Sequence, residues 1–100
     1  MAKFRFTNKA VDDLSSIWNY TFDVWSERQA DLYYDMLIGF CQEIARNPLT
    51  IGKRYDRIDE NIYGRRAGKH ILFYRILSDD EIEIVRILHS SMDLKKRIKE

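Results

Sequence analysis

Residues 69–77 read KHILFYRIL and residues 82–89 read IEIVRILH, and these two stretches decide the fold. Both are rich in β-branched and aromatic residues, which favour strands. Residues 78–81, which separate them, are polar and typical of a hairpin turn. Apolar side chains occupy consecutive positions in both stretches, and successive side chains of a strand point to opposite faces. We therefore expect an antiparallel hairpin whose apolar residues face both sides of a sheet.

The register of this hairpin depends on the length of its turn. A turn with an even number of residues pairs His70 with His89 and Arg75 with Ile84. An odd number shifts the pairing by one residue, and the sequence pattern does not choose between the two.

The rest of the chain supplies helices and further strands. Residues 62–67 are a short candidate strand, and the alternation of residues 3–6 predicts another strand near the N-terminus. Apolar residues recur at helical spacing over residues 8–25 and again over residues 27–46, which predicts two amphipathic helices. Residues 91–98 predict a short helical tail.

Capping residues mark where these helices begin and end. Thr7 or Asn8 offers an N-cap oxygen for the first helix, and Ser26 does so for the second. Pro48 ends the second helix, and Ser91 is expected to cap the tail. The large aromatic residues on the two apolar stripes are expected in the core: Trp18, Trp25, Tyr33 and Phe40.

Together these elements predict one α+β domain over residues 1–100. The helices are expected to form an antiparallel hairpin on one face of a mainly antiparallel sheet, in the order β-α-α-β-β-β, followed by the short helical tail. Two helices cover only one face of that sheet, so we expect a partner segment to cover the apolar residues of the other face. The alternative is a cover made by strand twist, the loop at 49–60 and the tail.

Composition is that of an ordinary globular protein. The chain has 100 residues, with 17 Lys and Arg against 16 Asp and Glu, a balance that argues against a polybasic nucleic-acid tail. The first 45 residues contain 4 basic and 7 acidic side chains, and the remaining residues contain 13 and 9. Because Cys41 is the one cysteine and no signal or membrane-spanning stretch is recognisable, we expect a cytoplasmic protein without a membrane partner.

The sequence predicts no metal or cofactor site. His70 and His89 have no cysteine or carboxylate at a ligand spacing, and Cys41 lies on an apolar stripe, where a buried core role is expected. Gly64 and Gly68 flank two arginines and do not open a helix, so the pattern does not indicate a phosphate-binding loop.

Basic residues gather on or near the predicted strands. Arginines that stabilise developing charge, with a histidine as general acid or base, could cleave RNA through its 2′-hydroxyl. The alternative is that strand arginines pair with carboxylates or an acidic peptide, while loop arginines are solvated. The residues in question are Arg54, Arg57, Arg65, Arg66, Arg75, Arg86 and His89.

Three stretches, in this order, resemble the ParE branch of the ParE/RelE toxin superfamily. They are DDLSSIWNY at 12–20, YGRRAGKHILFYRI at 63–76 and IEIVRILHSSMD at 82–93. The resemblance covers nearly the whole chain and implies a RelE/ParE-like fold. It also implies a bacterial type II toxin, active in growth inhibition and plasmid stabilisation, that a cognate ParD-like antitoxin holds inactive in a hetero-oligomer.

The superfamily divides by target. ParE-like members poison DNA gyrase, whereas RelE-like members cut messenger RNA on the ribosome. By rough alignment, the residues of the cutting branch fall near Tyr55, Ile71, His89 and Ser90, and of these only His89 fits. The resemblance therefore favours gyrase poisoning without a catalytic residue, a cofactor or sequence-specific nucleic-acid recognition. The alternative is ribosome-dependent RNA cleavage by His89, Arg65, Arg66 and Arg75.

Two sets of contact residues follow from this hypothesis. The antitoxin is expected to contact the sheet through Phe73, Arg75, Arg86 and Leu88. The target is expected to contact Arg65, Arg66, His89, Met92 and Asp93.

Overall fold

The computed structural model describes residues 2–100 and confirms the α+β plan. No helix in this range is both long enough and apolar enough to cross a membrane. The elements are β1 (Lys3–Phe6), α1 (Asn8–Val24), α2 (Glu27–Arg46), α3 (Pro48–Ile51), β2 (Lys53–Arg54), β3 (Tyr63–Ala67), β4 (His70–Ser78), β5 (Glu81–His89) and α4 (Leu94–Ile98). The short elements α3 and β2 lie where the sequence predicts only a loop.

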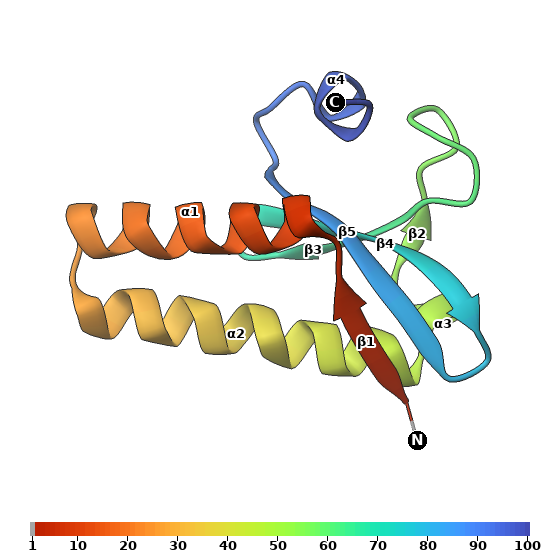
Figure 1. Ribbon diagram of the computed structural model, residues 1–100, viewed down its shortest axis with the longest axis horizontal. Helices are drawn as coiled ribbons and strands as arrows, with labels where there is room; N and C mark the ends of the chain where they lie inside the picture. Colours follow the sequence, from red (N-terminus) through yellow and green to blue (C-terminus); the bar gives the residue numbers. More distant parts are fainter. Residues whose placement is uncertain (1) are drawn as a thin grey trace.

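The strands form one mixed sheet in the order β1-β5-β4-β3-β2. β1 pairs with β5 in parallel, and the other neighbours pair antiparallel. In Figure 1, α2 lies on one side of the sheet, and α4 and the loop between β2 and β3 lie on the other. The helix hairpin extends well beyond the sheet, so its far end has no strands beneath it.

Side-chain caps begin the helices. The hydroxyl of Thr7 accepts the Ala10 N–H at 3.1 Å, and the hydroxyl of Ser26 accepts the Gln29 N–H at 3.1 Å, as their sequence positions predict. The prediction of Ser91 as the cap of the tail is wrong, because the Asp93 side chain caps α4 by accepting the Lys96 N–H. Ser91 bonds to a histidine ring instead.

A β-bulge in β5 explains why the turn alone could not give the register. His70 lies opposite His89 and Phe73 lies opposite Arg86, as an even turn predicts. The pairing then shifts by one residue, so that Arg75 lies opposite Glu83, and Val85 is the extra residue of the bulge. A second shift between Ile76 and Ser78 restores the first register, so that Ser78 lies opposite Glu81 next to the turn.

The main core lies between the helices and the sheet. Leu37, Cys41 and Ile44 of α2 are fully buried against strand residues such as Leu72 and Ile84. Burial raises the pKa of the Cys41 thiol to about 12, which keeps the thiol neutral and unreactive.

The expectation that Trp25 belongs to the core is wrong. Its side chain is 72% exposed. Trp25 follows the last residue of α1, at the end of the helix hairpin that projects past the sheet (Figure 1). Trp25 is the C-cap residue of α1 and has a non-helical backbone, so helical spacing does not place its side chain in the core.

The expectation of an uncovered second face is also wrong. On that face a smaller core forms around Phe73 and Leu88, which are 0% and 1% exposed. The chain covers this core itself, through the loop that precedes β3 and through α4. The covering side chains are Tyr55, Ile58, Leu94 and Ile98.

The ion pair between Arg86 and Asp13 joins the sheet to α1. Arg86 Nε and Nη2 donate to the two carboxylate oxygens of Asp13 at 2.8 and 3.0 Å, and the Ile87 N–H donates to the same carboxylate at 3.0 Å. Arg86 Nη1 also donates to the Arg97 carbonyl of α4 at 2.7 Å. The hydrogen bonds that Arg86 donates to Asp13 raise the pKa of Arg86 above its ordinary value. One arginine therefore connects β5, α1 and α4.

Replacement of Asp13 by Ala tests this connection. The substitution leaves the buried Arg86 guanidinium without its carboxylate, so we expect the free energy of unfolding to fall by about 3 kcal/mol. The matched control is Asp12→Ala, at the exposed neighbouring position, which should cost less than about 0.5 kcal/mol. Urea denaturation at neutral pH measures both. A loss below about 1 kcal/mol for Asp13→Ala would contradict this role of the ion pair.

Candidate functional site

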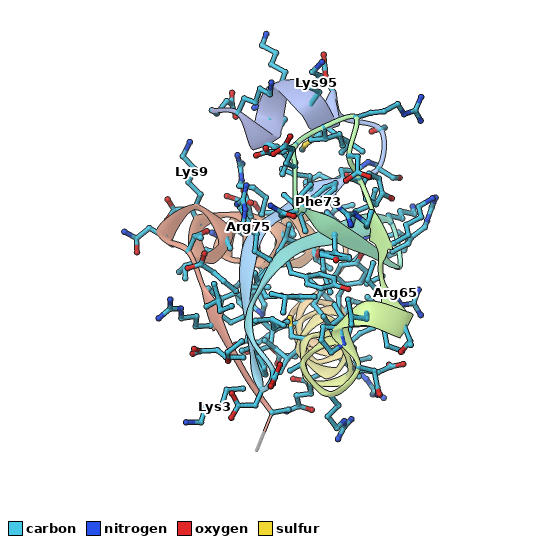
Figure 2. All side chains as sticks on the ribbon, turned by 90° about the vertical axis from the view of Figure 1, so that its right-hand side faces the viewer. Lys3, Lys9, Arg65, Phe73, Arg75 and Lys95 are labelled. Carbon is cyan, nitrogen blue, oxygen red and sulfur yellow. The ribbon has the colours of Figure 1, made fainter. Side chains whose placement is uncertain are left out.

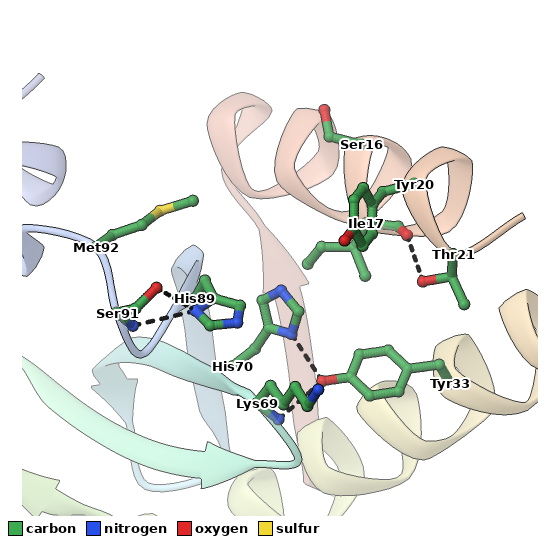
Figure 3. Close-up of a pocket in the computed structure, with 10 residues that line it drawn as sticks. All are labelled: Ser16, Ile17, Tyr20, Thr21, Tyr33, Lys69, His70, His89, Ser91 and Met92. Carbon is green, nitrogen blue, oxygen red and sulfur yellow. Dashed lines mark hydrogen bonds between the residues drawn. The ribbon is translucent and has the colours of Figure 1, made fainter. Parts of the chain in front are cut away.

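A pocket of about 430 Å³ opens where β4 begins and β5 ends. Its wall comes from α1, α2, the turn before β4 and the segment after β5 (Figure 3). The residues that shape it include Ile17, Tyr20, Tyr33, His70, His89 and Met92. The volume lies within the usual range for small-ligand sites.

Strand pairing places the two histidines side by side in this pocket. His70 and His89 are direct partners across β4 and β5, so their side chains share the face that looks toward the helices. Their ring centroids are 5.3 Å apart, and the ring planes are nearly perpendicular. Figure 3 shows both rings beneath α1.

Tyr33 of α2 holds His70 in position. Its hydroxyl oxygen accepts the Lys69 N–H at 3.1 Å and lies 2.7 Å from Nδ1 of His70. The hydroxyl proton has two acceptors within reach, Nδ1 of His70 at 2.7 Å and the Ala67 carbonyl at 3.4 Å. The shorter contact favours donation to Nδ1, and the neutral His70 ring then carries its proton on Nε2.

Gly68 makes this contact possible. As the first residue of the two-residue turn between β3 and β4, it has a φ of 61°, a conformation that favours glycine. A Cβ atom at this position would also lie only 2.8 Å from the Tyr33 hydroxyl oxygen.

Ser91 holds the second histidine. Its backbone N–H donates to Nδ1 of His89 at 3.1 Å, and its hydroxyl oxygen lies 2.7 Å from the same nitrogen. Because a backbone N–H can only donate, Nδ1 is the acceptor and the neutral ring carries its proton on Nε2. In Figure 3, this second nitrogen of His89 points toward His70.

The environment keeps His70 neutral. Burial lowers its pKa from 6.5 to about 4, and repulsion from His89 contributes in the same direction, while Asp13 opposes it. At neutral pH the His70 ring is therefore a hydrogen-bond donor without charge.

The structure does not bring together the four residues of the nuclease alternative. Arg65 lies over the Phe40 ring, 4.8 Å from its centroid, and Arg75 pairs with Asp59 at 2.8 Å. Arg66 follows Arg65 in β3, so the two side chains point to opposite faces of the sheet. His89 lies in the pocket, which is lined by none of these three arginines.

The predicted contact residues are also spread over the molecule. Among those assigned to the target, His89 and Met92 line the pocket, whereas Arg65, Arg66 and Asp93 do not. Among those assigned to the antitoxin, Phe73 and Leu88 are buried under the chain's own loop and α4, and Arg86 is engaged by Asp13. Arg75 is half-exposed, with 36% of its side chain accessible.

Two important residues were missed by the sequence interpretation. The sequence pattern gives Asp13 no role beyond its place in the first predicted helix, and it predicts only a core position for Tyr33. Their partners are 73 and 37 residues away in the sequence, respectively. No local pattern marks such pairs. Within residues 2–100, no group of three or more His, Cys, Asp or Glu side chains is placed to hold a metal ion.

The fold is shared with solved toxin–antitoxin structures. A chain from the chromosomal ParDE system of P. aeruginosa has a TM-score of 0.76 at 16% identity, covering 89% of this chain and 96% of that one. A chain from the RelBE2 toxin–antitoxin complex of Mycobacterium tuberculosis has a TM-score of 0.67 at 24% identity, covering 91% and 93%. These likenesses show the fold class, the α+β fold found in chains of these two toxin–antitoxin systems.

Sequence comparison identifies the family within this class. Residues 4–94 match the family model of the ParE toxin of the type II toxin–antitoxin system, parDE. Toxin ParE1 of Mycobacterium tuberculosis (strain CDC 1551 / Oshkosh) is 33% identical over 97 residues, which is 97% of this chain and 98% of that relative. The chain therefore belongs to the ParE toxin family of type II toxin–antitoxin systems.

The lowered pKa of His70 predicts how stability depends on pH. The unfolded chain binds a proton at His70 near 6.5, whereas the folded chain binds it near 4. Between these values the unfolded state holds more protons, so the contribution of His70 is complete above 6.5 and is lost as the pH falls toward 4. The stability advantage of wild type over His70→Gln should therefore be smaller at about pH 5 than at about pH 7.5.

Urea denaturation of both proteins at the two pH values measures this difference. Gln keeps an acceptor for the Tyr33 hydroxyl, so the comparison isolates the charge of the ring. An equal difference at both pH values, or an NMR titration midpoint for His70 near its ordinary pKa of 6.5, would contradict the prediction.

Proposed function

We propose that this ParE toxin inhibits growth in the cytoplasm by poisoning DNA gyrase, and that a cognate ParD-like antitoxin neutralises it in a hetero-oligomer. Family membership supports the toxin–antitoxin pairing. The observation that favours gyrase over messenger RNA is the dispersal of the nuclease candidates, because a ribonuclease must gather its acid, base and phosphate clamps around one scissile bond.

Each of the three arginines in the nuclease alternative interacts with a different partner within the protein. The Arg65 guanidinium lies over an aromatic ring, the Arg75 guanidinium pairs with Asp59, and Arg66 donates to the Gly68 carbonyl. Ile71, at the position where a cutting enzyme would need an arginine, is 6% exposed and part of the second-face core. This arrangement supports action by binding.

Messenger RNA cleavage is the second candidate function, because His89 does open into a pocket. The pocket also contains Lys69, which could neutralise a phosphate. In either case, we place the target contact at the mouth of this pocket, where His89 and the 42% exposed Met92 lie. Asp93, Arg65 and Arg66 are further candidates outside its wall.

A supercoiling assay with purified gyrase and antitoxin-free toxin tests the proposed target. We expect loss of supercoiling and accumulation of cleaved plasmid as the toxin is titrated through stoichiometric amounts. A translation reaction with purified ribosomes, run in parallel with the same toxin, should leave the messenger RNA intact. Intact supercoiling together with cleaved messenger RNA would reverse the assignment in favour of the second candidate.

Arg75 is the predicted antitoxin contact that can be tested without disturbing the core. It forms a partly exposed pair with Asp59, and Arg54 forms a similar pair with Asp56, with 55% of the Arg54 side chain exposed. If the antitoxin covers Arg75, Arg75→Glu should weaken the complex by about 2 kcal/mol. The matched Arg54→Glu variant should change the binding free energy by less than about 0.5 kcal/mol.

Isothermal titration of each toxin variant with the antitoxin measures these affinities. Circular dichroism establishes that both variants are folded. Equal affinity of folded Arg75→Glu and wild type would remove Arg75 from the antitoxin interface.

A further inference from the structure

Several polar groups of the pocket are already engaged within the protein. The Thr21 hydroxyl donates to the Ile17 carbonyl at 2.8 Å, and the Tyr33 hydroxyl is used by Lys69 and His70. Nδ1 of His89 is used by Ser91. The groups left to meet a ligand are two imidazole Nε2–H groups and the Lys69 ammonium, which can only donate, and the hydroxyls of Ser16 and Tyr20, which can donate or accept. Among residues 2–100, no acidic side chain lines this pocket.

The opposite part of the wall is apolar. Ile17 and Tyr20 of α1 and Met92 after β5 line it, and Tyr20 and Met92 are 66% and 42% exposed. Figure 3 shows Ile17 and Tyr20 on the α1 side and Met92 on the side of the C-terminal segment, with the histidines between them. Exposed apolar groups beside convergent donors are typical of a ligand site.

We propose that this pocket binds a carboxylate carried on an apolar body. The carboxylate accepts from the two Nε2–H groups and pairs with Lys69, while an aromatic or aliphatic group packs against Ile17, Tyr20 and Met92. The inference concerns the pocket itself and holds whether or not gyrase is the target.

The surrounding charges favour a carboxylate over a phosphate. Phosphate sites commonly use the two-pronged guanidinium of arginine, but Arg86 next to this pocket is held by Asp13, and Arg65 lies over Phe40. One ammonium and two neutral imidazoles match a single negative charge. The charge of the neighbouring Asp13 is compensated by Arg86, so it does not oppose an anion strongly.

The carboxylate has two possible sources, a peptide or a free small acid. N-Acetylphenylalanine represents a peptide C-terminus with its apolar side chain, and benzoate represents a free aromatic acid. Tighter binding of the first would indicate a protein segment as the natural ligand, and tighter binding of the second would indicate a small molecule. Either order supports a carboxylate site.

NMR titration of the whole chain tests the proposal, because its two histidines give only two sets of ring signals. We expect saturable shifts of both His70 and His89 with at least one of the two acids, with a Kd of about 1 mM for such small probes. Benzyl alcohol, which has the ring without the charge, and inorganic phosphate, which has charge without the ring, should each bind at least about tenfold more weakly.

Two lysine variants provide the matched control. Lys69→Met should weaken binding of the better acid roughly tenfold by removing the charged partner. Lys95→Met removes another exposed lysine, which lies on α4 outside this pocket (Figure 2), and should leave the affinity unchanged. Absent shifts, equal binding of benzyl alcohol or phosphate, or equal losses in the two variants would overturn the proposal.

Discussion

The bidentate contact of Arg86 with Asp13 is the interaction on which the arrangement of this toxin depends. β1 pairs with β5 only as far as Ile84, and beyond that point α1 replaces β1 along the edge of β5. Thr7 and Asp13 satisfy the exposed backbone groups there, through the Val85 carbonyl and the Ile87 N–H. Because α1 is fixed in this position, its next turn lies over the ends of β4 and β5 and forms one wall of the pocket.

The two faces of the sheet use different kinds of cover. α2 covers one face with a long apolar stripe, whereas short segments, α4 and the loop before β3, cover the other. Arg86 also contacts α4 through the Arg97 carbonyl, so the ion pair contributes to this second cover as well. The sheet consequently has no bare apolar face among residues 2–100. An antitoxin that binds on the second face of the sheet must therefore contact the outer surface of α4 and the loop before β3, or displace these segments.

Fold and target are separate questions in this family. The same α+β arrangement is found in a chain of a ParDE system and in a chain of a RelBE2 complex. A fold does not by itself fix the function that it carries. The positions of individual side chains say more about function than the fold does. Two histidines, a lysine and apolar side chains line one pocket, while the arginines that could serve a nuclease are engaged elsewhere.

The sequence by itself determined the features that depend on residues close to one another along the chain. Helical periodicity, the Ser26 cap and strand-forming residues are local signals, and they predicted the element order and the α2 stripe correctly. The exposure of Trp25, the covered second face and the Tyr33–His70 contact were decided only by the tertiary structure. Each of these three features depends on where a segment distant in the sequence ends or folds back. Packing between distant segments sets these positions, and it leaves no periodic signal in the sequence.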